Sequence, residues 1–381
     1  MPSRDTVADW LRWQESLNPR PVDLGLERAR EVLARLALRV PAGRVVAVGG
    51  TNGKGSTITL IHDLLLATGR NPGLYTSPHL VHYNERICIG NRPVADGALL
   101  RAFERVEAAR GGVPLTYFEF GTLAALVCFA DAGCDTWFLE VGLGGRLDAV
   151  NVLDADIALV TTIGLDHQAW LGDTIEAIAV EKAGIFRKDR VALYGDAPVP
   201  DGIRGTALGM GAKLYVQGED FRWSPDPAQG CRWNWSWPGN SSVQRLGPLA
   251  APSYWTAAQF RNATLALAAV SRLEGGVSAL SRESLDSVLL SSRPTGRFQI
   301  VRQEHEWVLD VAHNPQAAAV LRAQLQTLPA TPDGKVADTF VVALLADKSA
   351  AWFLAELGGA GGRWIASGVD DPRANTEAGM R

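Results

Sequence analysis

Short apolar runs alternate with amphipathic stretches along most of the chain. The run RVVAVGG, at residues 44–50, is rich in valine and ends in glycine, which is typical of a buried parallel strand that leads into a loop. STITLIHDLLLATG, at 56–69, then has apolar residues at helical spacing and a glycine at its end. The pattern therefore predicts a strand, a loop and a helix in direct succession.

The same alternation continues to about residue 195. Strands are predicted at NPGLYTSP, DTWFLEVG, ADIALVTTIG and RVALYG, and helices at FGTLAALVCFADAG and TIEAIAVEKAGIF. Strands that alternate with helices indicate an α/β fold with a doubly wound, mainly parallel sheet. The first 40 residues carry apolar residues at helical spacing and predict helices instead.

One segment between residues 190 and 250 departs from this alternation. In FRWSPDPAQGCRWNWSWPG, at 221–239, aromatic and polar residues alternate around proline and glycine. This pattern predicts a small antiparallel hairpin element. No cluster of basic residues accompanies the aromatic ones, so we expect a structural role and not a face that stacks on nucleic acid bases.

A second, smaller Rossmann-like α/β domain is predicted near the C-terminus. Proline and glycine lie close together in SSRPTGRF, at 291–298, as they do at many domain boundaries. Strand and helix patterns then resume in EWVLDVAHNP, QAAAVLRAQLQTL, TFVVALLA and SAAWFLAEL. We therefore predict two domains, at 1–292 and 297–381, as a chain of 381 residues also suggests.

Composition adds mainly exclusions. Hydrophobic residues make up 47% of the chain, charged residues 20%, and the formal net charge is −4, which does not favour nucleic acid or an anionic membrane as a partner. The longest apolar run is too short to span a bilayer, and the N-terminus lacks the apolar stretch of a signal peptide. The four cysteines have no metal-binding spacing, so we expect reduced thiols and a cytoplasmic protein.

The glycine-rich stretch GGTNGKGST, at 49–57, lies between the first predicted strand and its helix. A common phosphate-binding loop places Ser or Thr directly after its lysine, whereas here Gly55 separates Lys54 from Ser56. Backbone N–H groups in such a loop, and the positive end of the next helix, can hold phosphate oxygens. Although a glycine-rich loop can be a mere tight turn, the lysine and the flanking elements predict nucleotide binding, with Ser56 within reach of Mg²⁺.

Three further residues stand where ligands of open α/β sheets collect. Glu140 ends a predicted strand, where a carboxylate can bind Mg²⁺ or pair with an arginine. On chemistry alone, His167 in GLDHQAWLG is expected to form hydrogen bonds, because Mg²⁺ prefers oxygen ligands. Lys182 in EKAGIF, taken by itself, predicts a solvated ion pair on a helix.

The predicted second domain carries three more candidates. Asp310 and His313, in LDVAHNP, again follow a strand. Arg297 lies at the domain junction, where an arginine can reach a phosphate across a cleft or simply make a surface contact. The residues themselves leave both interpretations of Arg297 open.

Eight motifs, in this order, resemble those of folylpolyglutamate synthase/dihydrofolate synthase, the folate branch of the Mur-type ATP-dependent amide ligases. They are GTNGKGS, TSPHLVHYNERI, TYFEFGTLAAL, EVGLGGRLDAVN, LDHQAWLG, EKAGIF, GRFQIV and DVAHNP. The resemblance runs from about Trp10 to about residue 350 and implies a P-loop-type ATPase domain and a smaller glutamate-ligase domain, with ATP between them. It further implies ligation of L-glutamate to dihydropteroate or to folate polyglutamates through an acyl phosphate, with release of ADP and phosphate.

The resemblance also implies residue roles. Matches to nucleotide-binding positions are Gly53, Lys54, Gly55, Ser56, Asn262, Arg297 and Asp310. Matches to ligands of Mg²⁺, expected at two sites, are Ser56, Ser77, Glu140, His167 and Lys182. The family carbamylates the lysine that matches Lys182, so the resemblance replaces the chemistry-only interpretations of Lys182 and His167. Lys54, Lys182 and His313 match catalytic positions.

Pteroate contacts are implied at three separate segments. They are Val22, Asp23 and Leu24; Thr116, Tyr117, Phe118 and Glu119; and Leu147, Asp148 and Ala149. The alanine at 149 resembles the bifunctional members that accept dihydropteroate. The expected partners are these small-molecule substrates, without nucleic acid or membrane, and the expected state is a monomer.

Departures from the family pattern leave alternatives open. LLADKS, at 344–349, differs at its last residue, and a Gly-Ser-Phe-like stretch that helps to bind glutamate has no match near the end of the chain. DPRANTEAGMR, at 371–381, is polar, so the second domain is expected to be short at its end. The alternatives are a UDP-muramoyl peptide ligase of the Mur type and a non-catalytic ATP-binding remnant.

Overall fold

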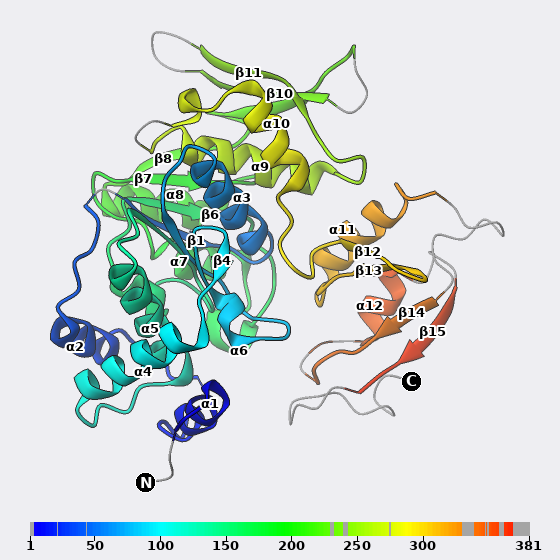
Figure 1. The fold of residues 1–381 in the computed structure, drawn as a ribbon. Coiled ribbons are helices and arrows are strands. Elements are labelled where there is room, and N and C mark those ends of the chain that lie inside the picture. Colours follow the sequence, from blue (N-terminus) through cyan, green and yellow to red (C-terminus); the bar gives the residue numbers. More distant parts are fainter. Residues whose placement is uncertain are drawn as a thin grey trace. The chain divides into compact units, whose positions relative to one another are not determined.

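The computed structural model describes residues 4–20, 22–42, 44–228, 232–238, 243–273, 276–329, 339–346, 348, 350–357 and 362–368. The chain divides into two compact units (Figure 1). The first comprises the residues up to Ala250 together with Arg261–Ser292, and the second comprises Ala251–Phe260 together with the residues from Arg293 on. Each unit is described by itself below.

An eight-stranded sheet forms the centre of the first unit, in the order β4-β3-β2-β5-β1-β6-β7-β8. Six strands run parallel: β1 (Val45–Gly49), β2 (Pro72–Tyr75), β5 (Thr136–Glu140), β6 (Ile157–Val160), β7 (Val191–Tyr194) and β8 (Lys213–Val216). The short β3 (Ile87–Ile89) and β4 (Arg92–Pro93) pair antiparallel at one edge. The predicted doubly wound, mainly parallel α/β fold is confirmed, and β3, β4 and β8 add to the predicted strands.

Valine dominates β1 because this strand lies at the middle of the sheet. Val46 pairs with Phe138 on one side and Ile157 on the other, and all five β1 residues are buried. A strand that is covered on both faces needs apolar residues at every position, which explains the continuous run in place of an alternating one. The carboxyl ends of β1, β5 and β6 therefore meet at one edge of the sheet.

Helices of the first unit connect and cover these strands. They are α1 (Val7–Glu15), α2 (Glu27–Leu36), α3 (Lys54–Leu66), α4 (Asp96–Arg110), α5 (Tyr117–Asp131), α6 (Gln168–Leu171), α7 (Ile175–Ala183), α8 (Asp201–Met210) and α10 (Arg282–Ser291). Short 3₁₀ turns lie at η1 (Tyr83–Arg86), η2 (Ala149–Val152) and η3 (Val277–Ala279). Helix α5 is apolar on every side because most of its residues are buried between the sheet and α4.

The aromatic segment forms a separate three-stranded antiparallel sheet. Its strands, β9 (Arg222–Pro225), β10 (Arg232–Pro238) and β11 (Val243–Ala250), lie in the order β11-β10-β9, so the predicted hairpin is confirmed with a third strand. Trp233 and Trp235 lie two positions apart on β10 and are both fully buried, and the indole N–H of Trp235 donates to the carbonyl of Thr264 at 3.1 Å. These two tryptophans are core residues of the first unit.

The described residues of the second unit form two pairs of strands and two helices, besides the start of a helix shared with the first unit. Strands β12 (Gln299–Arg302) and β13 (Glu306–Leu309) are antiparallel, β14 (Thr339–Val342) and β15 (Arg363–Ala366) are parallel, and the helices are α11 (Pro315–Leu325) and α12 (Ala350–Leu357). Residues 251–260, which precede the boundary expected near 291–298, also belong here, because Tyr254 packs on Phe298 at 5.2 Å between ring centroids. Helix α9 (Ala257–Val270) carries the chain from this unit into the first.

Two expectations about composition can be compared with the described residues. Cys88, Cys128 and Cys134 are free thiols, and burial raises the pKa of Cys128 to about 12. The fourth cysteine, Cys231, and the polar stretch 371–381 lie outside the described residues. In the described part of the chain, no helix is long and apolar enough to cross a bilayer.

Two glycines allow the loop after β5 to pack against the end of α7. A Cβ atom at Gly184 would lie 2.4 Å from the Cβ of Arg146, and one at Gly145 would lie 2.8 Å from the carbonyl oxygen of Glu181. Asn151 supports the same contact, since its amide donates to the carbonyls of Arg146 and Gly184 at 2.9 and 3.2 Å. The loop can approach the helix this closely only because both positions lack a side chain.

We expect Gly184→Ala to lower the free energy of unfolding by about 1–3 kcal/mol, because the added methyl group would overlap with Arg146. The matched control is Gly205→Ala in α8, where nothing lies within 4 Å of an added Cβ. That change should stabilise the protein by about 0.4–1 kcal/mol through lower chain entropy. Urea denaturation measures both effects, and equal responses of the two variants would contradict the close packing at Gly184.

Candidate active site

The loop between β1 and α3 depends on glycine at two positions. Gly50 has φ +139°, and a Cβ atom there would lie 1.9 Å from Oγ1 of Thr161. Gly53 precedes α3 with φ +86°, and a Cβ atom there would lie 2.7 Å from Oδ1 of Asn262. Among the described residues no side chain caps α3, and its first turn contains no acidic residue. The loop and helix terminus therefore suit an anion such as phosphate.

Two lysines converge on this loop. The Nζ atom of Lys54 donates to the carbonyl oxygens of Gly50 and Thr51 at 3.0 and 3.2 Å. The Nζ atom of Lys182, from the last turn of α7, donates to the same Gly50 carbonyl at 3.0 Å. Lys182 is only 5% exposed, and burial, together with the charge of Lys54, lowers the pKa of Lys182 to about 7. Two amines that share one carbonyl form a centre suited to negative charge.

A carboxylate lies beside the same loop. Glu140 ends β5 and is buried, and its Oε2 accepts a hydrogen bond from the backbone N–H of Ser77 at 3.0 Å. A Cβ atom built on Gly55 would lie 3.6 Å from Oε1 of Glu140. Since β2 and β5 are parallel neighbours, Ser77 and Glu140 reach the same edge of the sheet. The structure therefore brings Ser77, Glu140 and the Gly55 backbone together.

His167 lies on the loop that follows β6. It precedes α6 with a left-handed φ of 51°, and its backbone N–H donates to the carboxylate of Asp166 at 2.9 Å. The charge of Asp166 acts on Lys182 and partly opposes the lowering of the Lys182 pKa. Thr51 holds the same loop, because its hydroxyl contacts the carbonyl and N–H of Gly164 at 3.2 and 3.0 Å. The loop that carries His167 is thus attached to the glycine-rich loop.

Asp148 is held within the turn that the sequence assigned to pteroate. Its Oδ2 accepts from the N–H groups of Gly142 and Leu143 at 3.1 and 2.8 Å, and its Oδ1 accepts from Val150 at 2.9 Å. Burial raises the pKa of Asp148 to about 6, and the charge of Lys54 is among the interactions that oppose this rise. Ala149, buried at the start of η2, follows directly. The turn therefore lies within electrostatic reach of the lysine centre.

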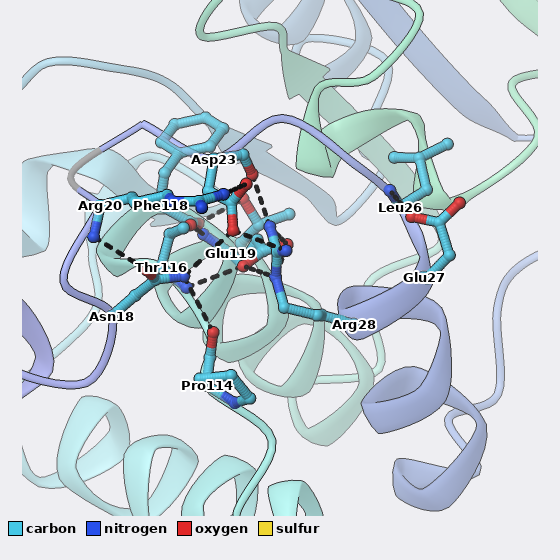
Figure 2. Close-up of polar contacts among 11 residues, drawn as sticks. Asn18, Arg20, Asp23, Leu26, Glu27, Arg28, Pro114, Thr116, Phe118 and Glu119 are labelled. Atoms are coloured by element: carbon cyan, nitrogen blue, oxygen red, sulfur yellow. Dashed lines mark hydrogen bonds and ion pairs between the residues drawn. The ribbon is translucent and has the colours of Figure 1, made fainter.

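The other two segments assigned to pteroate lie next to each other. Thr116 and Glu119 form a capping box at the start of α5, in which Oε2 of Glu119 accepts from the N–H of Thr116 at 2.7 Å. Arg28 contacts both Glu119 and Asp23, as Figure 2 shows. Phe118, between these residues in sequence, packs on Tyr75 at 6.0 Å between ring centroids. Val22, Leu24 and Tyr117 are half-buried in the same segments.

The remaining candidates divide between the two units. Asn262 belongs to the first, beside Gly53. Arg297, Asp310 and His313 belong to the second. There, Asp310 accepts from the N–H groups of Phe298 and Ala312 at 2.8 Å each, burial raises the pKa of Asp310, and a ring nitrogen of His313 lies 2.9 Å from the carbonyl oxygen of Val311.

The structure adds residues that the sequence analysis missed. Thr161 and Thr162 receive the glycine-rich loop, through contacts of their hydroxyls with Asn52 at 2.6 to 3.2 Å. Both threonines directly follow the strand in ADIALVTTIG, a position at which ligand-binding residues of α/β sheets are common, so the sequence could have indicated them. Arg28, by contrast, stands in an ordinary helical pattern, and nothing local distinguishes it.

Oxygen donors at this edge suit a hard divalent cation. In the part of the chain that the structure describes, no three His, Cys, Asp or Glu side chains cluster as a ready-made metal site. Glu140 supplies a carboxylate beside the loop, and Ser77 and Ser56 carry hydroxyls on the neighbouring segments. Such a sparse set fits Mg²⁺, which keeps several waters and binds phosphate oxygens besides one or two carboxylates.

Comparisons with known proteins agree with this geometry. Residues 48–197 match the family model of the Mur ligase middle domain, which agrees with the α/β fold of the first unit and indicates a Mur-type ligase. The chain is 40% identical, over 372 residues, to dihydrofolate synthase/folylpolyglutamate synthase of Escherichia coli K12, with 97% of this chain and 83% of the relative covered. The chain belongs to the dihydrofolate synthase/folylpolyglutamate synthase family, whose members are ATP-dependent ligases.

Solved structures extend the likeness. E. coli FolC in complex with DHPP and ADP superposes with a TM-score of 0.87 at 37% identity, covering 99% of this chain and 87% of that one. A bifunctional folylpolyglutamate synthase/dihydrofolate synthase with Mn, AMPPNP and L-glutamate bound gives a TM-score of 0.86 at 37% identity, with the same coverage. The family resemblance is confirmed, and neither a UDP-muramoyl peptide ligase nor a non-catalytic remnant is favoured.

The pKa of Lys182 leads to a prediction about stability. The unfolded chain keeps the ordinary Lys pKa of 10.5, so between pH 7 and 10.5 it binds one proton more than the folded chain. Wild-type stability should therefore rise with pH in this window, whereas below it the folded protein carries a buried charge. Lys182→Met removes that charge, so its stability relative to wild type should be highest near pH 7 or below and should fall as the pH rises.

Urea denaturation in CO₂-depleted buffer, from about pH 6.5 to about pH 9, measures this trend. Lys188→Met is the matched control, because Lys188 is exposed in a turn that follows α7, so this change removes a lysine charge without affecting a buried site. A Lys182→Met difference that is constant over this range would show that the folded protein does not disfavour the Lys182 ammonium.

Proposed function

We propose that this chain joins L-glutamate to dihydropteroate, giving dihydrofolate, and extends folate polyglutamates, with ATP as the energy source. The observation that carries the proposal is the meeting of Lys54 and Lys182 at the Gly50 carbonyl, next to Glu140. A carboxylate is a poor electrophile, so the acid substrate must first become an acyl phosphate. Transfer of a phosphoryl group between two anions requires positive charge where the two meet.

The glycine-rich loop would bind the nucleotide phosphates. Gly53, Gly55 and Ser56 offer backbone N–H groups at the start of α3, and Lys54 offers an ammonium group. Asn262 contacts the loop at Gly53 and would orient the nucleotide. Arg297 and Asp310 of the second unit would supply the remaining nucleotide contacts, and His313 would act as a further active-site residue.

Divalent cations would lie between these phosphates and the sheet. Mg²⁺, when bound, supplies charge that offsets the negative charge of the reacting phosphate and carboxylate. Ser56, Ser77 and Glu140 would hold one ion, and His167 together with modified Lys182 would hold a second. The relatives support a divalent ion, since one structure contains Mn with AMPPNP.

Lys182 would bind metal as a carbamate. Its neutral amine would attack CO₂, form an N–C bond and release a proton, which converts a cation into a carboxylate-like ligand. The burial of Lys182 and its closeness to Lys54 both oppose an ammonium at this position, so the neutral amine is available near neutral pH. A lysine that the sequence alone assigned to a solvated ion pair would thus become a functional residue.

The pteroyl group would lie against segments 22–24, 116–119 and 147–149. Phe118 offers an aromatic face, and Asp148 fixes the turn that carries Ala149 through its hydrogen bonds with Gly142 and Leu143. The γ-phosphate would be transferred to the carboxylate of the substrate. The glutamate amine would then attack the acyl carbon, form the C–N bond and expel phosphate.

That the protein is a monomer and lies in the cytoplasm stays a prediction.

The direct test is an assay of ADP release and amide formation with ATP, glutamate and either dihydropteroate or tetrahydrofolate. We expect both acceptors to support turnover in the wild-type protein. Lys54→Ala should lower kcat at least about 100-fold, because it removes a charge at the phosphate without removing core volume. Lys188→Ala serves as control. Full activity of Lys54→Ala would exclude the loop as the phosphate site, and turnover with neither acceptor would refute the proposed reaction.

The carbamate requires its own test. Enzyme that has been dialysed into CO₂-depleted buffer should lose at least about tenfold in kcat and should recover when bicarbonate is added, as expected for a lost metal ligand. Lys182→Ala should be slow under both conditions. Full wild-type activity without CO₂, verified by the absence of the carbamate mass on the peptide that contains Lys182, would overturn this assignment.

A further inference from the structure

A cluster of charged and polar side chains lies around Arg28, at the start of α2. We call it the Arg28 cluster; its members are Asn18, Asp23, Arg28, Thr116 and Glu119 (Figure 2). Segments far apart in the sequence meet in it, since 91 positions separate Arg28 from Glu119. The cluster contains members of two of the three segments proposed to hold the pteroyl group, but Arg28 itself belongs to none of them.

The guanidinium of Arg28 bridges two carboxylates. Its Nε lies 3.2 Å from both carboxylate oxygens of Glu119, and its Nη2 lies 3.1 Å from Oε1 of the same residue. Nη1 lies 2.8 Å from Oδ2 of Asp23, and Nη2 also donates to the backbone carbonyl of Asp23. A planar fork with five N–H donors can bind both oxygens of Glu119 and both Asp23 acceptors at once, which the three donors of a lysine cannot do.

Without Arg28, the two carboxylates would repel each other. The Glu119 side chain is only 4% exposed, so its charge is poorly solvated and needs a partner. Arg20 also lies near Asp23, at 3.7 Å, but it is 76% exposed and such surface pairs contribute little. Arg28 is therefore the group that holds the Asp23 backbone and side chain against the start of α5.

Two further hydrogen bonds join this arrangement to neighbouring segments. The N–H of Gly25 donates to the carbonyl of Leu147 at 3.3 Å, which joins the segment after Asp23 to the turn of Asp148. The amide of Asn18 donates to the carbonyl of Pro114 at 3.1 Å on the other side. Arg28 itself stands on a rigid support, because Ala29 and Val32 of α2 are fully buried.

We propose that Arg28 is a positioning residue for the pteroyl substrate. It holds segment 22–24 against α5 in advance of binding, so that the substrate does not have to order this segment itself. The inference rests on the proposed function for its substrate, but the state of segment 18–26 in the ligand-free protein can be measured independently of any activity.

Arg35, on the same helix, provides a matched control for a purely structural arginine. It donates to the carbonyls of Ala109 and Arg110 and pairs with Glu31, so it ties α2 to the end of α4. It contacts none of the segments proposed to bind pteroate. Arg35→Met should therefore lack the kinetic effect, and it should lower Tm less than Arg28→Met does, because the pair of Arg35 with Glu31 is exposed.

The experiment compares wild type, Arg28→Met, Arg28→Lys and Arg35→Met. For Arg28→Met, we expect KM for dihydropteroate to rise at least about tenfold, while kcat at saturation and KM for ATP change less than about threefold. Arg28→Lys should give an intermediate KM, because an ammonium keeps the charge but has three donors in place of five and lacks the planar fork. Hydrogen exchange of amides 18–26 without substrate should be at least about tenfold faster in Arg28→Met than in wild type or Arg35→Met.

The outcomes separate the possible roles. If KM for dihydropteroate changes equally in Arg28→Met and Arg35→Met, or if KM for ATP rises in parallel, Arg28 has only a structural role and the inference is overturned. Unchanged exchange of amides 18–26 in Arg28→Met overturns it as well. If wild type turns over neither pteroate nor folate, the proposed function fails, whereas the exchange measurement still decides whether Arg28 holds the segment.

Discussion

The active-site architecture depends on the electrostatic repulsion between two lysines, Lys54 and Lys182, whose amines both donate to the Gly50 carbonyl oxygen in a mostly buried place. Like charges at this distance repel, and burial increases the cost, so the folded protein lowers the pKa of Lys182 to about 7 instead of keeping both charges. Two amines at one buried carbonyl oxygen do not stabilise the fold. The phosphate and the carbamate that we propose at Lys182 would supply negative charge at this carbonyl, and for that reason we propose that the reaction takes place here.

The topology of the sheet explains how Lys54 and Lys182 reach the same carbonyl oxygen. The loop after β1 lies between the ends of β5 and β6, which bring Glu140 on one side and the loop of Asp166 and His167 on the other. Gly50 must be glycine because Thr161, at the end of β6, leaves no room for a side chain. The threonines after β6 then hold the loop by their hydroxyls, so that its carbonyl faces the lysines at a fixed place.

Local patterns in the sequence predicted those parts of the structure that local physics determines. The valine run of β1 and the glycines before Lys54 reflect burial and backbone conformation at their own positions, and they gave the fold class and the loop. Lys182 could not be assigned in this way, because its partner Gly50 lies 132 positions away and only the folded chain brings them together. The same holds for Tyr254, whose stacking on Phe298 assigns residues 251–260 to the second unit although no sequence signal marks them.

The two ends of the proposed site differ in how their charges are satisfied. In the segments that we propose to bind the pteroyl group, the protein pairs its own charges, since Asp148 accepts three backbone N–H bonds and Arg28 lies between Asp23 and Glu119. Segments whose charges are already paired would select a ligand by shape and by apolar surface. At the glycine-rich loop two amines from segments far apart in the sequence meet at one carbonyl oxygen. If the phosphoryl group is transferred here, as we propose, the interaction with Lys54 should strengthen as negative charge accumulates at the transferring group, which is the condition for lowering the barrier and not merely binding the substrate.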